Sequence, residues 1–108
     1  MARVLLVEAD AALRGLIEEW LADEDWQLVD ERPDVVLVDL PAPRENGSAA
    51  VRRVSNAHPH APVVALSSSF FDGIETKGAI ARALGVASVL PKPLTRDALM
   101  AALRNARG

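Results

Sequence analysis

Four short, continuous apolar runs are the feature of this sequence that most restricts its fold. They lie within residues 4–7, 34–40, 62–69 and 87–93. In each run the apolar residues follow one another instead of alternating with polar ones, a pattern typical of strands that are buried on both faces. Strands of this kind form parallel sheets covered by helices. The four runs therefore predict the strands of a parallel sheet.

Helical patterns fill three gaps in this series. The first helix follows Asp10, which stands in the N-cap position. Its apolar residues recur with helical spacing and are Leu13, Leu16, Ile17, Trp20 and Leu21. Further helices are predicted over residues 48–57, over 74–84 with Gly85 at the end, and after Thr95 as N-cap to the end of the chain. Alternating strands and helices predict a doubly wound α/β domain with right-handed crossovers.

Residues 26–29 interrupt this alternation. They are mostly apolar, yet only residues 30–34 separate them from the next run. A parallel strand needs a crossover of a dozen or more residues, whereas five residues span at most about 17 Å. Residues 26–29 are therefore expected to be a loop, or an edge or arm that pairs irregularly or with another chain. The expected sheet has four parallel strands and an uncovered edge beside the first.

Composition narrows the class of protein. A chain of 108 residues, half of them apolar, is expected to form one domain over residues 1–108 without a deep substrate cavity. The absence of cysteine excludes disulfides, thiolate nucleophiles and cysteine-rich zinc sites. A net charge of −3 without a basic block predicts no DNA binding. No apolar run could span a membrane or serve as a signal peptide, so we expect a cytoplasmic protein.

Polar residues follow the ends of the predicted strands, where parallel sheets bind ligands. Glu8 and Asp10 follow the first strand, Asp39 lies in the second, Ser67 in the third and Lys92 in the fourth. Carboxylates brought together at one edge require a cation, and oxygen ligands suit Mg²⁺. A hydroxyl and an ammonium beside them suit the oxygens of a phosphoryl group. Asp39 is the candidate nucleophile because an aspartate can form an acyl phosphate.

The order and spacing of these residues resemble the receiver domains of two-component response regulators, the CheY-like family with a flavodoxin-like fold. The motifs RVLLVEAD, PDVVLVDLPAPRENG, PVVALSS and ALGVASVLPKPL carry the resemblance. It implies that Asp39 accepts a phosphoryl group and that Ser67 and Lys92 contact the phosphoryl oxygens. It also implies Mg²⁺ held by Glu8, Asp10, Asp39 and the backbone carbonyl of Pro41. The expected donor is a sensor histidine kinase or a phosphotransfer protein.

Three departures from the family pattern affect these expectations. Ala9 stands where the family has its second acidic residue, so the Mg²⁺ site is expected to be weakened. Val89 stands at the position of the aromatic switch and has no ring to change rotamer. The segment that holds a complete second strand and second helix in the family is cut to residues 26–33. The predicted fold is therefore a doubly wound parallel sheet that lacks the second helix.

Two functions are compatible with this pattern. The first is a single-domain response regulator, not an enzyme, that signals by partner binding or onward phosphotransfer after phosphorylation of Asp39. The second is a pseudo-receiver that docks or dimerises without phosphorylation, as Ala9 and Val89 favour. A hydrolase or nucleotide-binding enzyme is disfavoured, because no glycine-rich phosphate loop follows the first strand. Residues 26–29 are the predicted surface for a homodimer, with Trp26 either covering the sheet edge or lying in the partner interface.

Overall fold

The chain is described by a computed structural model that covers residues 2–7, 9–40, 46–67, 85–91 and 94–107. Its strands are β1 (Ala2–Val7), β2 (Trp26–Leu28), β3 (Val35–Leu40), β4 (Val63–Ser67) and β5 (Ser88–Pro91). The helices of the described residues are α1 (Ala11–Ala22), α2 (Asn46–Ala57) and α4 (Arg96–Arg107). These elements confirm the predicted α/β class. The predicted helix over residues 74–84 lies outside the described residues.

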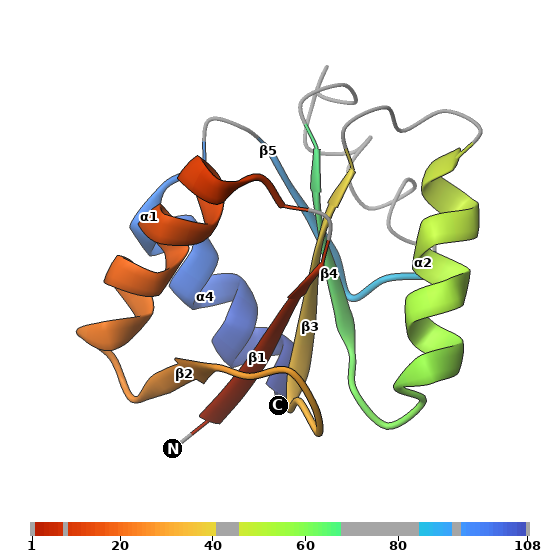
Figure 1. The fold of residues 1–108 in the computed structure, drawn as a ribbon, viewed down its shortest axis with the longest axis horizontal. Coiled ribbons are helices and arrows are strands. Elements are labelled where there is room, and N and C mark those ends of the chain that lie inside the picture. Colours follow the sequence, from red (N-terminus) through yellow and green to blue (C-terminus); the bar gives the residue numbers. More distant parts are fainter. Residues whose placement is uncertain (1, 8, 41–45, 68–84, 92–93, 108) are drawn as a thin grey trace.

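The strands form one parallel sheet in the order β2-β1-β3-β4-β5. Helices α1 and α4 cover one face, and α2 lies on the other (Figure 1). Each face has its own core cluster, because successive side chains of a strand point to opposite faces. The cluster on the α1 and α4 face, called here the first cluster, includes Val4, Leu6, Ile17, Leu21, Trp26, Leu37, Leu99 and Leu103. The second cluster consists of Val36, Val38, Val51, Val54, Val63, Ala65 and Val89.

The expectation of a four-stranded sheet is wrong, because residues 26–28 form a fifth strand. β2 pairs with β1 in regular parallel register, with Trp26 opposite Ala2 and Leu28 opposite Val4. Val35, the first residue of β3, lies opposite the same Val4. β2 therefore pairs only with the beginning of β1, and β3 starts at the level where β2 ends. In an ordinary crossover the chain runs back along the length of the sheet before the next parallel strand begins, usually as a helix. The connection from β2 to β3 does not have to run back, because β3 begins where β2 ends, and so it needs no helix.

Residues 29–34 cross β1 from one side to the other (Figure 1). The backbone N–H of Val29 donates to the Val4 carbonyl at 2.9 Å, and that of Asp34 donates to the Arg3 carbonyl at 2.8 Å. Asp34 also accepts a 2.9 Å hydrogen bond from the Arg3 N–H through its Oδ2 atom. The Arg3 guanidinium donates to the Glu31 carbonyl at 2.9 Å. All residues of this crossover are described and none is helical, which confirms the predicted loss of the second helix.

Two predicted N-caps are present. Asp10 accepts a hydrogen bond from the Leu13 N–H at 2.8 Å, and Thr95 accepts one from the Ala98 N–H at 3.2 Å. Each side chain satisfies a backbone donor that the first helical turn cannot pair internally. These caps fix the beginnings of α1 and α4. No helix among the described residues has the length and apolar character needed to cross a membrane.

Candidate functional site

Asp39 lies near the carboxyl end of β3, the central strand of the sheet. Its side chain is 6% exposed, and Asp39 is the only buried charged residue in the described part of the chain. The preceding four residues of the strand are valines and a leucine that are fully buried. Because a charged group is rarely buried without a functional or structural reason, the position marks Asp39 as the centre of the candidate site.

The strand register brings the backbones of the other predicted site residues to the same edge. Leu40, which follows Asp39, pairs with Ser67, and Ser67 pairs in turn with Pro91. Lys92 follows Pro91 in the sequence but lies outside the described residues, and the side chain of Ser67 is not described. The register therefore agrees with a shared edge for Asp39 and Ser67, while the contacts of Ser67 and Lys92 with a phosphoryl group stay predictions.

The predicted metal ligands are only partly within the described residues. Glu8 and Pro41 lie outside them. Asp10 is exposed, and its Oδ1 atom accepts the N-cap hydrogen bond from Leu13. Among the described residues no group of three or more histidine, cysteine or acidic side chains is arranged to hold a metal ion. The Oδ1 atom of Asp10 is used by the helix cap. A metal-binding role for its other carboxylate oxygen stays a prediction.

Two of the departures from the family pattern now have a structural description. Ala9 is half-buried and packs against the first cluster. Val89 is 4% exposed and belongs to the second cluster, among the valines of β3, β4 and α2. Both side chains therefore contribute to apolar packing at positions where the family pattern has an acid and an aromatic ring.

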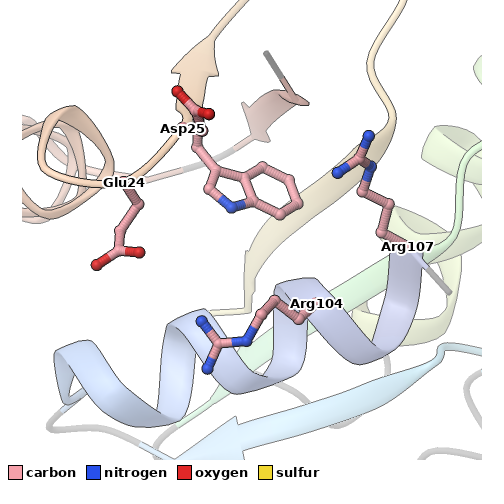
Figure 2. A pocket seen from close by; sticks show the side chains of 5 residues that line it. Glu24, Asp25, Arg104 and Arg107 are labelled. Atoms are coloured by element: carbon pink, nitrogen blue, oxygen red, sulfur yellow. The ribbon is translucent and has the colours of Figure 1, made fainter.

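A hollow that sequence analysis did not predict lies between the turn before β2 and the last turns of α4. It has a volume of about 500 Å³ and is lined by Glu24, Asp25, Trp26, Arg104 and Arg107. In Figure 2, Glu24 and Asp25 come from the turn, whereas Arg104 and Arg107 project from the helix. Arg104 and Arg107 are three positions apart, so the sequence alone indicates that they lie on the same face of the helix. This spacing is the only sign of the hollow in the sequence.

Trp26 is the aromatic residue that lines this hollow. Its side chain is 8% exposed in the first cluster, and the Arg107 guanidinium lies 5.9 Å from the ring centroid. Trp26 is therefore a core residue on one face of the sheet and part of the edge strand itself, which differs from the expectation that it covers the sheet edge; its role in a partner interface stays a prediction. On the same side of the molecule Arg96 pairs with Glu24 at 2.8 Å. The predicted homodimer through residues 26–29 stays a prediction.

The parallel sheet with a buried aspartate near the carboxyl end of its central strand agrees with the receiver fold that the sequence predicts. The chain belongs to the response regulator receiver domain family, whose model matches residues 4–104. It is 28% identical to the transcriptional regulatory protein CpxR of Escherichia coli K12 over 96% of this chain and 48% of that protein. It is 32% identical to a protein-glutamate methylesterase/protein-glutamine glutaminase of Rhodopseudomonas palustris over 91% of this chain and 31% of that one.

Solved receiver domains have the same fold. A response regulator receiver domain protein from Clostridium thermocellum superposes with a TM-score of 0.76 at 20% identity, covering 99% of this chain and 94% of that one. The receiver domain of the sensor histidine kinase PA1611 from Pseudomonas aeruginosa superposes with a TM-score of 0.75 at 22% identity, covering 99% and 98%. That structure has a magnesium ion coordinated in its active-site cleft. The chain spans about half the length of CpxR and about a third of the methylesterase.

Proposed function

We propose that Asp39 accepts a phosphoryl group from a histidine kinase or a phosphotransfer protein. The observation that carries this proposal is the burial of the Asp39 carboxylate near the carboxyl end of the central strand, in a chain of the receiver domain family. Ligands of open parallel sheets bind at this end of the strands. Leu40 is in register with Ser67, which supports a hydroxyl next to the acceptor.

The proposed transfer needs little chemistry beyond positioning and charge stabilisation. A carboxylate oxygen of Asp39 attacks the phosphorus of a phosphohistidine. A P–O bond forms as the P–N bond breaks, and the released imidazole nitrogen keeps the electron pair and takes up a proton. Ser67 and Lys92 are the proposed partners of the phosphoryl oxygens. Hydrolysis of the acyl phosphate by water then returns the free carboxylate and inorganic phosphate.

The donor set proposed for Mg²⁺ consists of Asp39, Glu8, the Pro41 carbonyl and the second oxygen of Asp10. All of these are hard oxygen ligands of the kind that Mg²⁺ takes in proteins, and the buried Asp39 supplies one of them. When bound, the ion neutralises negative charge on the transferred group. Ala9 supplies a methyl group to the core instead of a carboxylate. We therefore propose a weaker Mg²⁺ site than one with a second acid at this position.

Signalling without phosphorylation is the second candidate function, because two side chains favour it. Ala9 and Val89 pack into the apolar clusters and leave neither an acid nor a switch ring at their positions. A domain of this kind would act as an interaction module through its surface alone. The two candidates differ in one measurable property, the reactivity of Asp39.

Incubation with acetyl phosphate and Mg²⁺ tests the proposal, with the intact mass of the protein as the readout. We expect a gain of one phosphoryl group that is absent in Asp39→Asn and that hydroxylamine removes. Substitution of another acid, Asp30→Asn, is the matched control and should leave the gain unchanged. No gain from acetyl phosphate together with no transfer from any phosphorylated kinase or phosphotransfer protein would support the interaction module instead.

A further inference from the structure

The hollow between the turn before β2 and the last turns of α4 has charges of opposite sign on its two walls. Glu24 and Asp25 lie on the turn, and Arg104 and Arg107 project from the helix (Figure 2). The two negative and two positive charges cancel. A ligand with a single charge would be attracted by one wall and repelled by the other, so the hollow favours a ligand that carries both charges.

Three of these four side chains are available to a ligand. Asp25, Arg104 and Arg107 are exposed, and none of them forms an ion pair with another described residue. Glu24 is already engaged, because the Arg96 guanidinium donates to its Oε2 atom at 2.8 Å. Asp25 is therefore the carboxylate of the acidic wall that can accept from a ligand. The basic wall has two guanidiniums, each with N–H groups in a planar fork that matches a carboxylate.

The hollow also has an apolar surface. Trp26 lines it and belongs to the first cluster. The Arg107 guanidinium lies 5.9 Å from the centroid of the Trp26 ring, so the basic wall adjoins this surface. Small-molecule sites commonly combine apolar surface with a few polar groups that fix the orientation of the ligand. The volume of about 500 Å³ is within the range of such sites, about 300–1,000 Å³.

A second copy of this chain is a poor occupant of the hollow because of its shape. A two-fold axis through this region would place the same patch of both copies face to face. One hollow would then lie opposite another, and the enclosed space would lack the contacts that stabilise an interface. A small molecule can enter the hollow and fill it. Shape and charge together therefore favour a small ligand with a positive and a negative end.

We propose that the hollow binds a zwitterion of about dipeptide size with an apolar body. Its ammonium group donates to the Asp25 carboxylate, and its carboxylate accepts hydrogen bonds from Arg104 and Arg107. Its apolar part contacts the Trp26 ring. The charged ends of an extended dipeptide are about 7 Å apart, so they can reach walls that belong to different elements. The two charged groups of a single amino acid are attached to the same carbon atom.

The proposed site and Asp39 lie at opposite ends of the sheet. Trp26 pairs with Ala2, the first residue of β1, whereas Asp39 lies near the carboxyl end of β3. A bound ligand would connect the turn before β2 to the end of α4. Because both walls are assembled only in the folded chain, the ligand should also raise the temperature of thermal unfolding.

Titration of the isotope-labelled protein with leucyl-leucine, followed by NMR, tests the proposal. Three related compounds separate the contributions of the ligand. N-acetyl-leucyl-leucine lacks the ammonium group, leucyl-leucine amide lacks the carboxylate, and leucine has both charges on one carbon atom. We expect saturable shifts of the Trp26 indole signal and of the side-chain N–H signals of Arg104 and Arg107 with leucyl-leucine. The other three compounds should bind more weakly.

Two variants with matched controls identify the contacts. Asp25→Asn should bind leucyl-leucine roughly two- to fivefold more weakly, as expected for a solvent-exposed ion pair, and should bind the acetylated peptide as the unchanged protein does. Arg104→Gln should show a similar loss with leucyl-leucine and no loss with the amide. Asp30→Asn and Arg52→Gln remove exposed charges that do not line the hollow and should leave binding unchanged.

Several outcomes would overturn the proposal. They are the absence of saturable shifts with leucyl-leucine, equal affinity for the two dipeptide derivatives, and unchanged affinity in both Asp25→Asn and Arg104→Gln. Tighter binding of the acetylated peptide would also overturn it, because the hollow would then prefer an anion. Equally tight binding of leucine would reject the dipeptide size. None of these measurements depends on the reactivity of Asp39.

Discussion

Leu28 and Val35 flank the same residue of β1, since each lies in register with Val4 from opposite sides. The crossover between them therefore spans two strand spacings, about 10 Å. Six extended residues could span about 20 Å, so the segment has length to spare. Arg32 takes up part of this length in a left-handed conformation, with φ of 54°. This stagger of β2 against β3 makes a helix-free crossover possible.

The reciprocal pairing of Arg3 and Asp34 should stabilise this crossover. Asp34→Ala removes the carboxylate that accepts the Arg3 N–H, and we expect the free energy of unfolding to fall by about 1 kcal/mol. Asp30→Ala, an exposed neighbour without such a bond, should change it by less than about 0.5 kcal/mol. Urea unfolding of both variants measures the difference. Equal stability of the two variants would show that the carboxylate does not hold the crossover.

Two glycines should respond to alanine with opposite signs. Gly85 has φ of 77°, and Gly15 lies inside α1, while a Cβ at either position would have no neighbour within 4 Å. Gly85→Ala should lower the free energy of unfolding by about 1–2 kcal/mol, because a left-handed conformation is unfavourable for alanine. Gly15→Ala should raise it by about 0.5–1 kcal/mol, because alanine favours a helix interior. Thermal unfolding of the pair is the measurement, and a shift in the same direction for both would contradict this account.

Asp10 can be tested separately as a cap and as a metal ligand. Asp10→Ala removes the acceptor of the Leu13 N–H and should cost about 1 kcal/mol of stability. Asp10→Asn keeps an equivalent cap and should be nearly neutral, since asparagine and aspartate cap equally well. If Asp10 also contributes to the proposed Mg²⁺ site, Asn should still weaken Mg²⁺ binding, as calorimetric titration would measure. Unchanged Mg²⁺ affinity in Asp10→Asn would limit the residue to its role as a cap.

Trp26 should be important for stability as part of the core. Trp26→Ala empties a position that is 8% exposed beneath Arg107 and should lower the free energy of unfolding by about 3–5 kcal/mol. Trp26→Phe keeps a ring and should be much less costly. Arg107→Ala removes only the cation over the ring, worth about 0.5–1 kcal/mol at an exposed site. Denaturant unfolding of the three variants tests this order, and a small loss in Trp26→Ala would remove Trp26 from the core.

Much of the fold could be predicted because apolar patterns report burial directly. The run over residues 34–40 forms β3 with its valines in the core, and Asp10 and Thr95 cap the helices that they precede. β2 could not be predicted in this way, because its pairing depends on the stagger between Leu28 and Val35. Register is a relation between distant segments, and the spacing rule for crossovers assumes strands that start at the same level.

The candidate site could be predicted in part for a similar reason. Asp39 is identified by the apolar strand that precedes it, and its burial agrees with that prediction. The hollow beside Trp26 combines a turn at residues 24–25 with the last turns of α4. These segments are far apart in the sequence and have no shared motif. Their proximity follows from how α1, β2 and α4 pack on one face, which residue patterns do not specify.

The short crossover also has a consequence for the order in which the chain folds. Arg3 and Asp34 are separated by 31 residues, and their bonds connect β1 to the start of β3. With no helix between β2 and β3, fewer residues separate β1 from β3 than in a chain with a full crossover. A shorter loop loses less entropy when it closes, so the two strands pair faster. Paired residues are 31 positions apart between β1 and β3 (Val4 and Val35), 27 between β3 and β4 (Val36 and Val63) and 24 between β4 and β5 (Val64 and Ser88). The short crossover therefore brings the β1–β3 separation close to that of the other pairs, and we expect β1 and β3 to pair at a similar stage of folding to the other strands.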